Sequence, residues 1–142
     1  MRFVDASVFL YAYLKPKRTM PHGVAEMKRA AKAIVTTING GENAASRLTH
    51  ISEVAKILEA VMSLEESHKI VRDLIHATTI SLFEPTRVNY VDAIEIAENS
   101  SVRLNGALAY VLMRTQGVEE IYSFDRDFDK FRDIKRVYSW TR

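Results

Sequence analysis

Apolar residues recur every three or four positions along most of the chain, which is the spacing of one buried helical face. The clearest case covers residues 20–39, and Asn39-Gly40-Gly41 ends it. The same spacing predicts further helices at residues 6–14, 47–61, 63–77, 87–99 and 104–116. Helices therefore account for most of the predicted structure.

Short apolar segments separate these helices and are typical of buried strands. They predict strands at residues 2–5, 79–83, 120–124 and 134–138, with a short helical turn at 126–131. Strands separated by helices pair in parallel through crossover connections. The pattern therefore predicts an α/β fold, a three-layer α/β/α arrangement around a central parallel sheet, in a single domain spanning residues 1–142.

The amino-acid composition excludes several kinds of chemistry but says little about the fold. The chain has 142 residues, 47% hydrophobic and 27% charged, with no cysteine, which excludes thiolate metal sites and cysteine nucleophiles. No segment approaches the roughly 20 apolar residues of a membrane span. The opening apolar run breaks at Asp5, unlike a signal peptide. We expect a cytoplasmic protein with no membrane partner.

Charge is distributed unevenly around a small net value of +2. Residues 33–125 carry a net negative charge, and the segments 15–32 and 126–142 are basic. The first basic segment contains Lys15, Lys17, Arg18, Lys28, Arg29 and Lys32. Two basic flanks around an acidic centre suit a phosphate-bearing partner at a metal site. The alternative is that each basic side chain only solvates a helix face.

Two aspartates follow predicted strands, where ligands bind in parallel sheets. Asp5 ends the first strand, and Asp125 follows residues 120–124. Each could instead cap the next helix, but two acids at one sheet edge favour a cation site. Glu53, in the helix at 47–61, is the third candidate, and a solvent-facing glutamate is its alternative.

Other chemistries lack their motifs. The chain has no GxGxxG, GxxxxGK[ST] or G-x-S-x-G segment, and no HExxH pattern. Each of the four histidines is therefore expected at the surface. A phosphatase using Asp5 as nucleophile would usually have a second aspartate two residues on, where Ser7 stands. Mg²⁺ or Mn²⁺ chemistry on phosphodiesters remains.

Three segments, in this order, resemble the PIN-domain family of metal-dependent ribonucleases, which includes VapC-type toxins of toxin–antitoxin pairs. They are Phe3-Val4-Asp5-Ala6-Ser7-Val8-Phe9, Ser52-Glu53-Val54 and Ser123-Phe124-Asp125-Arg126-Asp127-Phe128. The resemblance covers essentially the whole chain. It implies a quartet of acids holding one or two Mg²⁺ or Mn²⁺ ions.

Matched to that quartet, Asp5, Glu53 and Asp125 take the first, second and fourth positions, and Asp127 is a further acid. The third position is an aspartate at the start of the helix at 104–116, and here it is Gly106. Asn105 could offer a neutral oxygen, but it lies about 100° round the helix from Gly106. Three carboxylates can still hold one hard cation with water.

The resemblance implies hydrolysis of RNA phosphodiesters, with the basic side chains of residues 15–32 holding the RNA backbone. It also implies a homodimer and an antitoxin protein as partner. Gly106 favours a second hypothesis, a PIN fold that has lost catalysis and binds RNA or a protein. The retained Asp5, Glu53 and Asp125 argue against that hypothesis.

Overall fold

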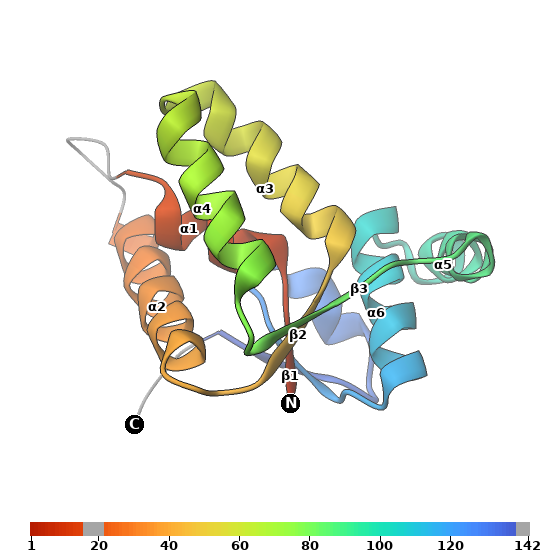
Figure 1. The fold of residues 1–142 in the computed structure, drawn as a ribbon. Coiled ribbons are helices and arrows are strands. Elements are labelled where there is room, and N and C mark those ends of the chain that lie inside the picture. The colour runs from red at the N-terminus through yellow and green to blue at the C-terminus, as the bar shows by residue number, and fades with distance from the viewer. Residues whose placement is uncertain (16–21, 139–142) are drawn as a thin grey trace.

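The computed structural model describes residues 1–15 and 22–138, in which five parallel strands form one sheet of order β3-β2-β1-β4-β5 (Figure 1). The strands are β1 (Arg2–Val4), β2 (Ala44–Arg47), β3 (Ile80–Phe83), β4 (Glu120–Tyr122) and β5 (Lys135–Val137). The helices are α1 (Ala6–Tyr13), α2 (His22–Asn39), α3 (Leu48–Val61), α4 (Leu64–His76), α5 (Arg87–Ser100), α6 (Leu104–Gln116) and the 3₁₀ helix η1 (Arg126–Lys130). None of the helices in these described ranges is long and apolar enough to cross a membrane.

Alternate strand residues face two different helical layers. Phe3, Ala45 and Ile121 are neighbours in register and pack against α5, α6 and η1. The next residues along β1 and β4, Val4 and Tyr122, face the opposite layer, which α1 to α4 build. Figure 1 shows this division, with α1–α4 on one side of the strands and α5 and α6 on the other. The predicted three-layer α/β/α fold is confirmed.

Strand β2 is the element that the sequence pattern missed. Its residues Ala44-Ala45-Ser46-Arg47 are all buried, and they pair with both β1 and β3. Alanine and serine have low strand propensity, and a strand covered on both faces shows no polar alternation. Helix α3 consequently begins at Leu48, because Arg47 belongs to the strand.

The prediction that Lys28 contributes to an RNA-binding surface is wrong. The side chain is only 8% exposed, and its ammonium group donates to the carbonyl oxygens of Tyr11 and Leu14 at the end of α1. A cation at a helix C-terminus satisfies carbonyls that lack partners within the helix. Lys28 therefore joins α1 to α2 and does not face solvent.

Replacing Lys28 should cost stability and not RNA affinity. Lys28→Met keeps the apolar stem but removes the charged donor, so we expect the free energy of unfolding to fall by about 2 kcal/mol. Lys32→Met is the matched control because Lys32 is exposed on the same helix, and it should change stability by less than about 0.5 kcal/mol. Urea denaturation measures both. Equal stability of the two variants would contradict the capping role.

Candidate active site

A pocket of about 470 Å³ opens where the carboxyl ends of β1, β2 and β4 meet the first turns of α1 and α6. The three acids singled out from the sequence, Asp5, Glu53 and Asp125, all line it. So do Asn105 and Gly106. The remaining lining residues that matter for its charge are Arg47 and Arg103. The pocket is therefore acidic with two arginines on its walls.

Asp5 is the most buried of the three acids, with a side chain 17% exposed. One of its carboxylate oxygens accepts hydrogen bonds from the hydroxyls of Ser123 (2.8 Å) and Ser7 (3.0 Å). Burial raises the pKa of Asp5, the two serines oppose that shift, and the negative charge of Asp125 adds to it. Asp5 and Asp125 are thus close enough to repel each other.

His50 is not the surface histidine expected from the sequence. It is 1% exposed, and its Nε2 lies 3.5 Å from Oδ1 of Asp5. Its Nδ1 lies 3.1 Å from Oγ of Ser46, whose hydroxyl donates to the carbonyl of Val4. The Ser46 oxygen can therefore accept from Nδ1. Burial and the charge of Arg47 keep the pKa of His50 well below its usual value. With its proton on Nδ1, the neutral ring has no hydrogen on Nε2 to donate, so it packs beside Asp5 without hydrogen-bonding to it.

Asp125 takes the capping role that the sequence offered, and it also lies in the pocket. It caps η1, because one carboxylate oxygen accepts from the backbone N–H of Asp127 at 2.9 Å, and it also lines the pocket. Its own N–H donates to Oγ of Ser123, the serine that also contacts Asp5. Asp127 is instead paired with Lys130 at 3.8 Å and does not line this pocket.

Glu53 reaches the pocket from the side of α3, and its side chain is 40% exposed. Partial burial raises its pKa, and Asp5 raises it further, whereas Arg47 lowers it. The guanidinium of Arg47 lies 3.7 Å from its carboxylate. Glu53 is therefore paired, and its alternative as an unattached surface glutamate does not describe it.

The donor set suits one hard divalent cation better than two. Asp5, Glu53 and Asp125 offer carboxylate oxygens to one pocket, as Mg²⁺ and Mn²⁺ prefer. Within residues 1–15 and 22–138, however, no three His, Asp or Glu side chains are already gathered closely enough to hold an ion. Glu53 would have to rotate toward the aspartates. The exposed Asn105 lies beside Gly106, which has no side chain to contribute.

The basic residues of the segment 15–32 have different surroundings in the structure. Lys15 pairs with Glu66 at 3.3 Å, and Lys17 and Arg18 lie outside the described residues. Arg29 and Lys32 are exposed on α2. Arg29 lines a second, larger hollow of about 1040 Å³, together with Phe124, Arg126, Arg136 and Tyr138. Glu26 and Asp129 also line this hollow, and Asp129 pairs with Arg136 at 2.9 Å, so three arginines face two acids there. Because Phe124 precedes Asp125, this mixed-charge groove lies close to the acidic pocket.

Sequence comparison identifies the family. The profile of the PIN domain matches residues 2–134. The chain belongs to the PIN domain family. No curated protein matches it significantly in sequence, so the family assignment rests on the profile and on the ordered acids Asp5, Glu53 and Asp125.

Solved structures of this fold agree with that assignment. The chain is similar to Mycobacterium tuberculosis VapC20, a sarcin–ricin loop cleaving toxin, with a TM-score of 0.71 and 17% identity over 91% of this chain and 93% of VapC20. It is also similar to a chain of Rickettsia felis VapBC2, solved bound to a DNA fragment from its promoter. That match has a TM-score of 0.65 and 8% identity, covering 96% of each chain. Both likenesses concern the fold.

The raised pKa of Asp5 makes a prediction about stability. The folded state binds the Asp5 proton more readily than the unfolded chain, so Asp5 destabilises the fold as pH rises above its ordinary pKa of 3.8. Asp5→Asn should therefore be more stable than the metal-free parent at pH 7, and this advantage should shrink toward pH 4. Denaturant unfolding across that pH range measures it. A pH-independent difference would contradict the shift.

Proposed function

We propose that this protein is a divalent-metal-dependent ribonuclease that hydrolyses RNA phosphodiesters. The observation that carries the proposal is one pocket lined by Asp5, Glu53 and Asp125 at the carboxyl ends of the strands of a PIN domain. The fold likeness to VapC20, itself a toxin that cleaves RNA at the sarcin–ricin loop, supports this substrate class.

The chain's own residues would position and neutralise the reacting groups. A bound Mg²⁺ or Mn²⁺ would polarise the scissile phosphate and offset its developing negative charge. Asp5 and Asp125 would hold the ion, and the hydroxyls of Ser7 and Ser123 keep the Asp5 carboxylate in a fixed orientation. Glu53, whose side chain is 40% exposed, would complete the ligands or orient the attacking water.

Two helix N-termini that line the pocket suit a phosphate group. Ala6 and Ser7 come from the first turn of α1, and Leu104, Asn105 and Gly106 from that of α6. Helix N-termini carry partial positive charge and free N–H groups that favour anions. Arg103 adds a charged side chain. The RNA backbone would continue along the neighbouring groove, where Arg29 and Arg126 would contact phosphates while Arg136 stays paired with Asp129, and its affinity would fall with salt.

An antitoxin protein is the partner we propose for it. The support is the fold shared with the VapC20 toxin and with a chain of the VapBC2 complex. A homodimer and a cytoplasmic location remain predictions from the sequence and the family resemblance.

The decisive experiment is cleavage of a labelled structured RNA by the purified chain. We expect cleavage with Mn²⁺ or Mg²⁺, none after chelation with EDTA, and recovery when the metal is restored. Calorimetric titration with Mn²⁺ should give a binding isotherm with one ion per chain. A chain that cleaves equally well in EDTA, or that binds no divalent ion, would rule out the proposed chemistry.

The second candidate is a PIN domain that binds RNA or a protein without cleaving. Gly106 supplies no ligand, and within the described ranges no three acids are gathered around a common point. This candidate predicts salt-sensitive RNA binding with no cleavage product at saturating Mn²⁺. Product formation above the level of an Asp5→Asn variant would exclude it.

A further inference from the structure

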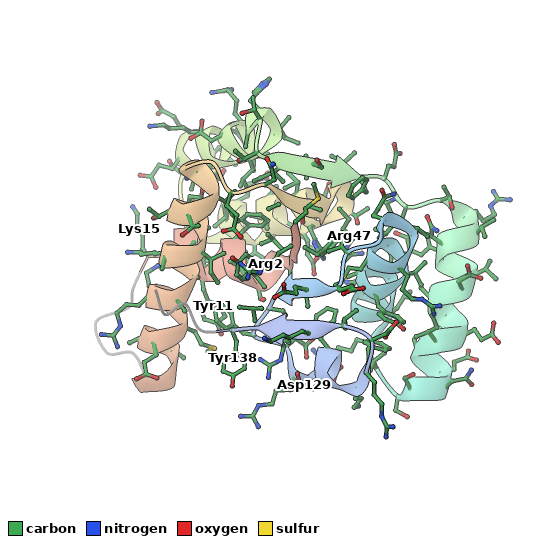
Figure 2. All side chains as sticks on the ribbon, turned by 90° about the horizontal axis from the view of Figure 1, so that it is seen from below. Arg2, Tyr11, Lys15, Arg47, Asp129 and Tyr138 are labelled. Carbon is green, nitrogen blue, oxygen red and sulfur yellow. The ribbon has the colours of Figure 1, made fainter. Side chains whose placement is uncertain are left out.

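A buried arginine stands among the acids of the pocket. Arg47 is the last residue of β2, and its side chain is only 2% exposed (Figure 2). Its guanidinium lies 3.7 Å from the Glu53 carboxylate, and among the described residues its Nε has no hydrogen-bond partner. It lines the pocket together with Asp5 and Asp125. The side chain is therefore held in the pocket wall by charge and not by a full set of hydrogen bonds.

Burying a charge is costly unless opposite charges compensate for it. Burial lowers the pKa of Arg47, and the negative charges of Glu53 and Asp5 oppose that shift by favouring the charged guanidinium. His50, which faces Asp5 from α3, is held neutral by its burial and by this same arginine, so it adds no positive charge. Arg103, on the rim, is exposed to solvent and screened. Arg47 is thus the buried cation that balances the carboxylates.

We propose that Arg47 is the resident counter-cation of the acidic pocket, and that a divalent ion binds there in competition with it for Glu53. The inference rests on the proposed function only in placing the ion in this pocket. An ion near Asp5 and Asp125 repels the guanidinium and attracts the Glu53 carboxylate away from it. Arg47 thereby weakens ion binding and disfavours a second ion, while keeping the metal-free fold stable.

The alternative is that Arg47 only ties the end of β2 to α3. Both hypotheses predict that its removal destabilises the metal-free chain, so stability alone does not separate them. The two hypotheses differ in the effect that a divalent ion should have on the chain without Arg47. A counter-cation can be replaced by a divalent ion, which restores the missing positive charge. A divalent ion cannot replace a contact that only holds the end of β2 against α3.

The test compares Arg47→Met, which keeps the stem and loses the charge, with Arg47→Lys, which keeps the charge. Arg103→Met is the control for an exposed arginine on the same pocket. Calorimetry gives the Mn²⁺ affinity, and thermal unfolding with and without saturating Mn²⁺ gives the gain in melting temperature. We expect Arg47→Met to bind Mn²⁺ about tenfold more tightly than the parent and to gain more in melting temperature. Arg47→Lys should stay close to the parent, and Arg103→Met should change less than Arg47→Met.

The outcomes separate this inference from the proposed function. If the parent binds Mn²⁺ and cleaves RNA but Arg47→Met gains no more from Mn²⁺ than the parent does, only the counter-cation role is wrong. If Arg47→Met is unfolded without metal, recovery of its helical circular dichroism on adding Mn²⁺ supports the role. Failure to fold at saturating Mn²⁺ overturns it. Absence of Mn²⁺ binding by both parent and Arg47→Met would overturn both proposals.

Discussion

Asp5→Asn is expected to lower RNA cleavage by about a thousandfold, because loss of the ion removes several kcal/mol of transition-state stabilisation. Asp5 follows β1 directly, and the hydroxyls of Ser123 and Ser7 both donate to its carboxylate. The asparagine has the same shape and keeps an oxygen that can accept from the serines. The cleavage rate should therefore fall because the ion is lost, and not because the variant fails to fold.

Three measurements establish this for Asp5→Asn. Its rate of RNA cleavage should fall, its Mn²⁺ isotherm should disappear, and its unfolding midpoint without metal should be no lower than that of the parent. Asp133→Asn is the matched control, because Asp133 pairs with Tyr110 and Arg114 in the second half of α6. It should leave the cleavage rate unchanged. If the Asp5→Asn protein is folded and still cleaves RNA at the parent rate, this pocket is not the site of cleavage.

The strand ends were predictable because they depend on local pattern. An apolar strand followed at once by an aspartate identifies Asp5. Asp125 comes three residues after the end of β4, and the parallel pairing of β1 with β4 brings both aspartates to the carboxyl ends of neighbouring strands. Helical periodicity likewise located the long helices. These features need only the nearest residues in the sequence, so one sequence is enough to find them.

The environment of the acids was not predictable in the same way. Arg47 and His50 are buried because Ala44–Arg47 forms an inner strand between β1 and β3, and that strand has no sequence signal of its own. Lys28 is buried because α2 lies against the end of α1. A count of charges treats Lys28 and Lys32 alike, whereas their roles depend on contacts between distant segments. The sequence showed that residues 126–142 are basic, but it did not show that Arg126 and Arg136 share one groove with Arg29 of α2, for the same reason.

Gly106→Asp is expected to tighten Mn²⁺ binding by about a hundredfold, since even outer-shell partners of a metal contribute 10–100-fold. Gly106 lines the pocket with Asp5, Glu53 and Asp125, and the family resemblance predicts that it stands where relatives carry a third acid. A Cβ placed there meets only the ring of Phe128 at 3.9 Å, an ordinary van der Waals contact. The carboxylate would sit in the first turn of α6, where the helix dipole favours a negative charge.

The same substitution should raise RNA cleavage above the parent level without loss of folding. Replacing a helical glycine improves helix propensity by up to about 1 kcal/mol, so stability with bound Mn²⁺ should rise. Gly106→Asn is the matched control, with the same shape and no charge, and it should gain far less affinity. Asp5→Asn in the Gly106→Asp background should erase the gain, because residues that share one ion are coupled. If Gly106→Asp folds but leaves Mn²⁺ affinity and cleavage unchanged, position 106 does not face the ion, and the missing third acid is not what limits this pocket.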